Sequence, residues 1–131
     1  MKRFLVLQFL VCVCAFQVQA QQTNSPAPIL ISAHRGNTGQ APENTLAAYK
    51  DALKVGVDYV EIDVRTTLDG KLVILHDATL NRTTNGEGPL KNKRIVELRE
   101  LSAGKGFIEF DKERIPTLKE VCQLISRWNI W

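Results

Sequence analysis

The sequence has few cysteines, few histidines and no long basic stretch. Two of its three cysteines, Cys12 and Cys14, lie in an apolar run near the N-terminus, so Cys122 is the only thiol in the rest of the chain. One cysteine cannot form an internal disulfide, which excludes a disulfide-stabilised scaffold. No basic stripe with interleaved aromatic residues is present, which argues against nucleic-acid binding. Internal repeats, heptads and a glycine-rich phosphate-binding loop are also missing.

The first twenty residues have the features of a secretory signal peptide. Lys2 and Arg3 precede an uncharged apolar run over residues 4–16, and small residues precede the expected cleavage site after Ala20. The run is shorter than the roughly 20 apolar residues of a membrane-spanning helix. We therefore expect a secreted or periplasmic protein with no stable membrane span after cleavage. The alternative is a short N-terminal anchor.

The rest of the chain predicts a short leader and one small domain. Without residues 1–20 the chain has 15 basic and 14 acidic residues, so its net charge falls from +3 to +1. Residues 21–28 are polar, contain two prolines and predict a flexible leader. Residues 29–131 are then enough for one small domain.

Residues 29–64 predict a βαβ unit and hence an α/β fold. The unbroken apolar run at residues 29–31, continued by Ser32 and Ala33, favours a strand buried on both faces. A helix is expected to begin within residues 42–45 and to stop at Gly56, with one apolar face. Residues 57–64 predict a second strand, which right-handed crossover places parallel to the first. The face of the helix contains Leu46, Tyr49, Ala52 and Leu53.

Acidic and apolar residues alternate at the end of the second expected strand. Because the side chains of a strand alternate between its faces, Glu61 and Asp63 are expected on one face. Two neighbouring carboxylates repel each other unless a cation lies between them, and Ca²⁺ and Mg²⁺ prefer oxygen ligands. The pair therefore predicts a divalent metal site or, alternatively, the solvent-facing acidic edge of a half-buried strand.

Asp69 and Gly70 indicate a turn between two strand-like runs. In a two-residue hairpin Leu68 pairs with Lys71, and the same register places His76 opposite Asp63. In the alternative topology the two strands are parallel and the residues between them form an extended crossover. Both topologies bring the imidazole of His76 close to the acidic pair.

The chain after residue 77 predicts a long irregular segment followed by a helix. Residues 78–114 are rich in Asn, Thr and Gly, and only residues 95–101 have helical spacing. A loop of this length beside a site is often functional. Within it, Asn81, Arg82 and Asn85 would line the pocket or serve as turn residues, and turn chemistry is the favoured interpretation. Thr117 and Glu120 form a capping box for the last helix, and residues 129–131 predict the approach to another strand. The apolar face of that helix, in which Cys122 is expected to pack in the core, contains Leu118, Val121, Cys122, Ile125 and Trp128.

Three stretches of the chain resemble the glycerophosphodiester phosphodiesterase family: ISAHRGNTGQAPENT, YVEIDVRTTLDGKLVILHDATLNRTTNG and IPTLKEV. The resemblance covers most of residues 29–128, and its HRG, PENT, ExD and HD motifs occur in the family's order. It implies a TIM barrel and an enzyme that hydrolyses glycerophosphodiesters to glycerol 3-phosphate and an alcohol. Both histidines of the mature chain fall in these motifs.

The resemblance also implies roles for individual residues. His34 and His76 would be the acid–base pair, and Glu61 and Asp63 would bind Ca²⁺ or Mg²⁺. Arg35 would hold the phosphate, or would only pair with Glu43 or Glu61. Glu43 would order the rim or the metal shell, or would only be a favourable charge at a helix N-terminus. Asp77 would orient His76 or cap the turn.

The chain departs from the family in its length. The family's further carboxylate ligand follows the IPTL helix, and a TIM barrel takes about 250 residues, so only three or so βα units are present here. We expect a fragment or truncated protein that has little or no activity and poor stability alone.

Two alternatives to the expected activity remain. One is a phospholipase-D-like or phosphoinositide-cleaving enzyme, and the other is a catalytically inactive secreted binding protein.

Overall fold

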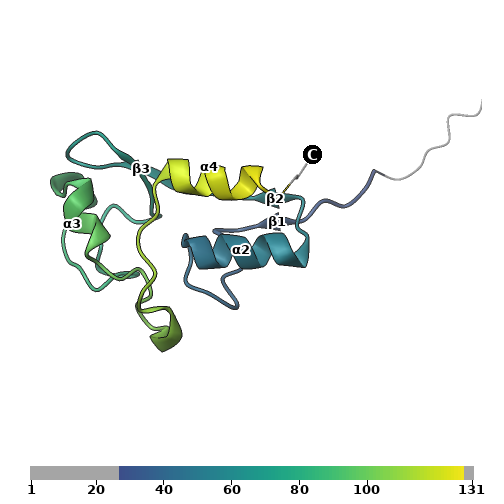
Figure 1. Ribbon diagram of the computed structural model, residues 1–131, viewed down its shortest axis with the longest axis horizontal. Coiled ribbons are helices and arrows are strands. Elements are labelled where there is room, and N and C mark those ends of the chain that lie inside the picture. The colour runs from purple at the N-terminus through teal and green to yellow at the C-terminus, as the bar shows by residue number, and fades with distance from the viewer. Residues whose placement is uncertain (1–26, 129–131) are drawn as a thin grey trace, which may run out of the picture.

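Residues 27–128 are described by the computed structural model and are drawn in colour in Figure 1. The signal peptide expected at residues 1–20 lies outside the described residues. So do most of the leader expected at residues 21–28 and the approach to a strand expected at residues 129–131. The expected domain is therefore described over nearly its whole length.

The first elements form a parallel βαβ unit. β1 (Ser32–Ala33) pairs with β2 (Tyr59–Val60), and α2 (Leu46–Val55) connects the two strands (Figure 1). The predicted parallel pairing is confirmed. Thr45 caps α2 by accepting a hydrogen bond from the Ala48 N–H at 3.2 Å, and the helix ends at Gly56 as expected. The buried face of α2 contains Ala48, Tyr49, Ala52 and Leu53.

The two predicted strands are shorter than expected. β1 contains only Ser32 and Ala33, and the prediction that this run is buried on both faces is wrong, because Ile29 is 93% exposed and Ile31 is 59% exposed. A parallel strand is buried when neighbouring strands and helices cover both its faces. Among the described residues, β2 is the one strand that pairs with β1. The second predicted strand, residues 57–64, ends at Val60, so Glu61 and Asp63 lie between strands.

A β-hairpin follows, in a register one residue away from the predicted one. β3 (Val64–Thr66) pairs with β4 (Leu72–Ile74) in antiparallel fashion, so the parallel alternative is wrong. Thr67 N–H donates to the Lys71 carbonyl at 2.9 Å and closes a three-residue loop in which Gly70 has a φ of 73°. The Thr67 hydroxyl accepts from the Lys71 N–H at 2.9 Å, which stabilises this longer loop. Asp63 therefore lies opposite Leu75, whose N–H donates to the Asp63 carbonyl, and not opposite His76.

The last helix, α4 (Leu118–Ser126), packs beside α2 although the two are far apart in the sequence (Figure 1). Its predicted capping box is present, since Thr117 Oγ1 accepts from the Glu120 N–H and Glu120 accepts from the Thr117 N–H. The prediction that Cys122 packs in the core is wrong, because this thiol is exposed. Cys122 follows the buried Val121 directly, so it points about 100° away from Val121 around the helix axis.

β4 separates two hydrophobic clusters. Because strand side chains alternate, Ile74 packs with Tyr49 and Val121 on one side, and Val73 packs on the other. The second cluster belongs to the long segment after residue 77, which folds as a packed lobe with η1 (Leu90–Asn92), α3 (Ile95–Arg99) and η2 (Ile108–Phe110). The helix predicted within residues 95–101 is confirmed as α3. The buried members of this cluster are Val73, Leu75, Leu80, Leu90, Leu98, Ala103 and Ile115.

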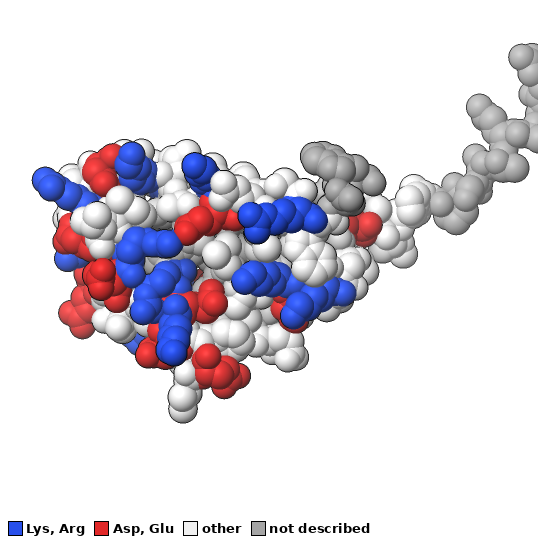
Figure 2. Space-filling model, in the orientation of Figure 1, with Lys and Arg blue, Asp and Glu red and all other residues white. Residues whose placement is uncertain are grey.

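The surface carries charges of both signs. On the face shown in Figure 2, Lys and Arg side chains are interspersed with Asp and Glu side chains and do not gather into one basic stripe. None of the helices within residues 27–128 is long and apolar enough to cross a lipid bilayer.

Candidate active site

The turn after β1 requires an unusual backbone. Arg35 has a φ of 58° and Gly36 has a φ of 87°. A Cβ atom on Gly36 would lie 2.8 Å from the Cβ of Ala48 in α2, so only glycine allows this close approach. The contact between the turn and α2 fixes the position of Arg35 at the end of β1.

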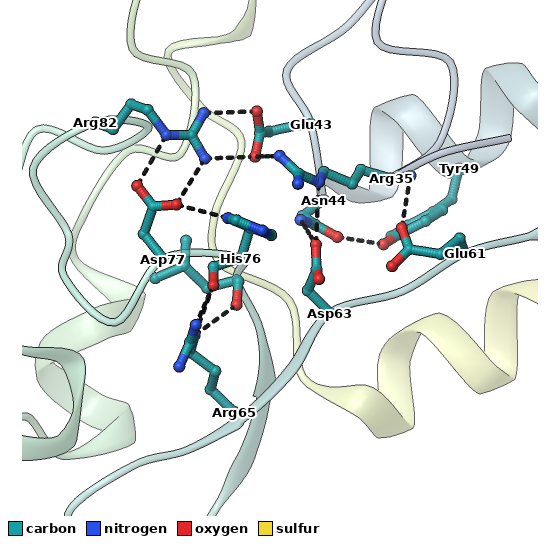
Figure 3. A network of polar contacts seen from close by, with 11 residues as sticks. Arg35, Glu43, Asn44, Tyr49, Glu61, Asp63, Arg65, His76, Asp77 and Arg82 are labelled. Carbon is teal, nitrogen blue, oxygen red and sulfur yellow. Dashed lines mark hydrogen bonds and ion pairs between the residues drawn. The ribbon is translucent and has the colours of Figure 1, made fainter.

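Arg35 contacts three of the predicted site carboxylates (Figure 3). Its backbone N–H donates to Glu61 Oε2 at 3.1 Å, and its Nη1 donates to Glu43 Oε1 at 3.1 Å. Its Nε lies 3.2 Å from Asp63 Oδ2, although the angle does not make a hydrogen bond and this buried N–H has no acceptor among the described residues. One arginine therefore joins the acidic pair to Glu43, as the pairing interpretation of Arg35 expected.

The acidic pair lies in the extended segment between β2 and β3. Glu61 and Asp63 are both partly buried, and each is held by a donor from the connection between β1 and α2. Glu61 accepts from the Arg35 backbone, and Asp63 Oδ2 accepts from the side-chain amide of Asn44 at 2.9 Å. The pair is thus oriented by a turn and not by the pleat of a single strand.

Arg82 links Glu43 to Asp77 (Figure 3). Its Nη1 and Nη2 donate to the two oxygens of Glu43 at 2.7 and 2.8 Å. Its Nε and Nη2 donate to the two oxygens of Asp77 at 2.8 and 3.0 Å. Such two-pronged pairs fix the orientation of both partners. The loop after the hairpin is therefore anchored to the segment that precedes α2.

The charges of this network shift the pKa values of its members. Hydrogen bonds from Arg82, and then from His76, hold the pKa of Asp77 well below its ordinary value of 3.8. The Arg82 hydrogen bond also lowers the pKa of Glu43 from 4.5, against the opposite effect of partial burial. Glu43 and then Asp77 raise the pKa of Arg82 further above its ordinary value. All three groups are ionised at neutral pH.

Asp77 and Arg65 hold His76 from two sides. His76 Nδ1 lies 2.7 Å from Asp77 Oδ1, and Arg65 Nε donates to the His76 carbonyl at 2.8 Å. Because an ionised carboxylate can only accept, Nδ1 carries the proton and Nε2 of the neutral ring carries the lone pair. The side chain of His76 is 44% exposed, so Nε2 is accessible.

The structure brings most of the predicted site residues into one network. Direct contacts join Arg35, Glu43, Glu61 and Asp63, and His76 joins them through Asp77 and Arg82. His34 precedes Arg35 in the chain and is exposed, with no polar side-chain contact among the described residues. The catalytic, metal-binding and phosphate-binding roles of these residues stay predictions.

For Arg82 the sequence favoured turn chemistry over a place in the pocket. The structure makes it the link between the two halves of the network. One signal could have indicated this: Arg82 is the only basic residue within residues 78–90, and it follows Asp77 by five positions in the segment that leaves the expected site.

The acidic pair offers the type of ligand that a divalent metal ion prefers, but too few ligands to complete its coordination. Glu61 and Asp63 offer hard carboxylate oxygens. Glu61 Oε1 and Asp63 Oδ1 have no hydrogen-bond partner among the described residues. Ca²⁺ takes about six to eight oxygens, and within residues 27–128 no group of three or more His, Cys, Asp or Glu side chains could hold a metal ion. A metal ion at this pair therefore needs further oxygens from substrate, water or other residues.

Comparison with known proteins decides the family. Residues 34–131 match the model of the glycerophosphoryl diester phosphodiesterase family. The chain belongs to this family. The resemblance carried by the HRG, PENT, ExD and HD motifs is thereby confirmed.

Members of the family from distant organisms are similar to the chain. A glycerophosphodiester phosphodiesterase of Caldanaerobacter subterraneus is 53% identical over 98 residues, which are 74% of this chain and 40% of that protein. Glycerophosphodiester phosphodiesterase 1 of Mus musculus is 45% identical over 101 residues, which are 75% of this chain and 30% of that protein. The chain thus spans well under half the length of these family members.

Solved structures of the family agree with the fold. A phosphodiesterase of Oleispira antarctica, in complex with the product sn-glycerol-3-phosphate, matches 76% of this chain and 41% of its own with a TM-score of 0.74 and 46% identity. A glycerophosphodiester phosphodiesterase of Agrobacterium tumefaciens matches 77% of this chain and 44% of its own, with a TM-score of 0.73 and 41% identity. These neighbours imply a TIM-barrel family, of which residues 27–128 form a small α/β part.

Proposed function

We propose that the complete protein carrying this chain hydrolyses glycerophosphodiesters to glycerol 3-phosphate and an alcohol, with Ca²⁺ or Mg²⁺ as cofactor. The observation that carries the proposal is the network of charged side chains around Arg35, described above. It combines a guanidinium whose buried Nε lacks an acceptor, an acidic pair and a histidine anchored through Nδ1. The family's activity and the product complex of the Oleispira relative support the same chemistry.

Arg35 is suited to bind the phosphodiester. A phosphodiester carries one negative charge, and a guanidinium can offer it two parallel N–H donors. Among the described residues the Arg35 Nε–H has no hydrogen-bond acceptor in good geometry, although Asp63 Oδ2 lies 3.2 Å from it, so this donor is available to an incoming oxygen ligand. Glu43 accepts a hydrogen bond from the Arg35 guanidinium, and Arg82 in turn donates to Glu43 and fixes its orientation. Arg35 is thus oriented before substrate arrives.

Glu61 and Asp63 would hold the metal ion. A bound Ca²⁺ or Mg²⁺ supplies Lewis-acid stabilisation of the negative charge that develops on the phosphoryl oxygen. The two carboxylates also offset the charge of Arg35 while the site is empty of substrate, since Asp63 lies 3.2 Å from Arg35 Nε. The guanidinium thus offsets part of the negative charge of the acidic pair.

The two histidines would move the protons. One imidazole deprotonates the attacking oxygen, and the other protonates the alcohol that leaves. With its proton on Nδ1, His76 offers Nε2 as a base, and the Asp77 carboxylate stabilises the imidazolium that forms. The attacking oxygen belongs either to water or to the glycerol hydroxyl of the substrate, which would give a cyclic phosphate first.

The test compares substrates and variants in the complete protein. We expect wild type to release glycerol 3-phosphate from glycerophosphocholine, and His76→Ala and His34→Ala to lose at least about 100-fold in kcat. Faster cleavage of intact phospholipids or phosphoinositides would favour the phospholipase-D-like or phosphoinositide-cleaving alternative. Binding of glycerophosphocholine without turnover would favour the inactive binding protein.

We also propose that the protein is exported, with cleavage after Ala20, to the periplasm or the medium. The basic start and the uncharged apolar run of residues 4–16 support this location. The intact mass of the natural protein tests it. A mass that includes residues 1–20 would contradict the proposed cleavage.

A further inference from the structure

Within residues 27–128, two residues other than glycine have a left-handed backbone, and they contact each other. Arg35 has a φ of 58° and Asn44 has a φ of 59°, and the Asn44 N–H donates to the Arg35 carbonyl at 3.0 Å. Such residues cost free energy and persist where the surrounding structure fixes them, often at functional sites. Each of the two holds one member of the acidic pair, Glu61 by the Arg35 N–H and Asp63 by the Asn44 amide.

The Asn44 side chain is fixed on both sides. Its Oδ1 accepts from the Tyr49 hydroxyl at 2.7 Å, and its Nδ2 donates to Asp63 Oδ2 at 2.9 Å (Figure 3). Asn44 is 2% exposed and Tyr49 is fully buried in α2. A carboxylate only accepts, so the amide nitrogen must face Asp63, and the hydroxyl of Tyr49 completes the orientation.

Tyr49 stays a donor throughout the working pH range. Burial raises the pKa of its hydroxyl, and the negative charges of Glu61 and Asp63 raise it further. The hydroxyl therefore keeps its proton and points it at Asn44.

The Asn44 amide does not contribute to the capping of α2. Thr45 is the N-cap, and its hydroxyl accepts from the Ala48 N–H. The Asn44 side chain turns away from the helix and contacts Asp63 across 19 positions of sequence. A role in helix formation does not account for a buried amide in a strained backbone.

We propose that Asn44, held by Tyr49, is a positioning residue that orients Asp63 for a divalent cation. The role rests on the proposed metal-dependent function. The Asn44 amide is neutral, so it orients the Asp63 carboxylate without neutralising its negative charge. Arg35, in contrast, forms an ion pair with the same carboxylate. Partners of this kind fix the ligand before the ion binds, and their loss costs about 10- to 100-fold in metal affinity or activity.

Two variants separate positioning from folding. Asn44→Gly removes the amide and keeps the positive φ without steric cost. Tyr49→Phe removes one hydroxyl and keeps the ring in the core. Arg99→Gln is the control, because it deletes a side-chain hydrogen bond of 2.7 Å to a carboxylate, Glu120, outside the site. Each variant is made in the complete natural protein.

The first readout is the Kd for Ca²⁺ and for Mg²⁺, measured by calorimetry without substrate. We expect Asn44→Gly to weaken metal binding about 10- to 100-fold, Tyr49→Phe to weaken it by a smaller factor, and Arg99→Gln to leave it unchanged. Excess metal should restore part of the lost kcat in both site variants. Cooperative thermal unfolding shows which variants are folded.

Metal affinity within twofold of wild type in a folded Asn44→Gly protein would overturn the positioning role. If Asn44→Gly does not fold, an unchanged Kd in Tyr49→Phe overturns it. If wild type binds metal but does not hydrolyse glycerophosphodiesters, the proposed function fails, while a weaker Kd in the variants still supports positioning of Asp63. If wild type binds no divalent cation, both the cofactor and the positioning role are overturned.

Discussion

At the scale of single residues, the site is organised by arginines that bridge carboxylates. Arg35 joins Glu43 to Asp63, and Arg82 joins Glu43 to Asp77. A bidentate guanidinium fixes the orientation of a carboxylate, which a lysine ammonium cannot do. The position of His76 therefore depends on Arg82 through Asp77.

Replacing Arg82 is expected to reduce catalysis without unfolding the protein. Arg82→Gln releases Asp77 and hence His76, and we expect kcat to fall about 10- to 100-fold. Arg82→Lys should recover only part of the loss. The matched control is Arg99→Gln, which breaks a two-pronged pair with Glu120, at 2.7 and 3.0 Å, outside the site. Wild-type kcat in Arg82→Gln would contradict this role.

The same variant should change the acid stability of the protein. The pKa values of Asp77 and Glu43 are lowered from 3.8 and 4.5 in the folded state. Their stabilising contribution is therefore fully present above these ordinary values and is lost as pH falls through the lowered ones. Urea unfolding at pH 6 and at pH 3 should show that the difference in stability between wild type and Arg82→Gln shrinks in acid. A constant difference would contradict the assigned pKa directions.

At the scale of the elements, the connection between β1 and α2 carries the site. Gly36 approaches Ala48 of α2 so closely that a methyl group does not fit. The turn residues on either side of this contact, Arg35 and Asn44, hold the acidic pair. Packing of the turn on α2 thus fixes the geometry of the site.

Gly36→Ala and Gly56→Ala form a matched pair that measures this contact. Both glycines have positive φ, 87° and 85°, so both substitutions carry the cost of about 1–2 kcal/mol for a left-handed backbone. Only at Gly36 does the new Cβ meet other atoms, so Gly36→Ala should cost about 1–3 kcal/mol more. Urea unfolding measures the difference. Equal free energies of unfolding would show that the approach to α2 is not tight.

Much of the element order followed from the sequence, whereas the register did not. Apolar periodicity and caps predicted α2, α3 and α4, because those signals are local. The predicted register of the hairpin differs from the observed one by one residue, because the hydrogen bond between Thr67 and Lys71 closes a loop of three residues and not two. Asn44 and Arg82 were not assigned to the site because their partners, Asp63 and Glu43, are distant in sequence, at separations of 19 and 39 residues.

At the scale of the whole molecule, the apolar surface of the βαβ unit is exposed. Ile29, Leu30 and Ile31 are 93%, 52% and 59% exposed, and Tyr59 on β2 is 58% exposed. Family members are much longer than this chain, which spans 40% of the Caldanaerobacter protein. We propose that this surface is covered in the complete protein.

The 131-residue chain by itself is therefore expected to be weakly stable and to hydrolyse little or no glycerophosphocholine. Exposed apolar side chains lose the stabilisation by burial, which amounts to about 25 cal/mol per Å². Urea unfolding and turnover measurements on the chain, with the complete natural protein as control, check this expectation. Brisk, chelator-sensitive turnover by the chain alone would contradict it.

The central claim is that the acidic pair and Arg35 form a metal-dependent phosphodiesterase site. The most direct measurement is glycerol 3-phosphate release from glycerophosphocholine by the complete protein, with and without a chelator, in wild type and Asp63→Asn. We predict turnover that stops with the chelator, returns with added Ca²⁺ or Mg²⁺, and falls at least about 100-fold in Asp63→Asn. Turnover that is unaffected by the chelator and by Asp63→Asn would contradict the account.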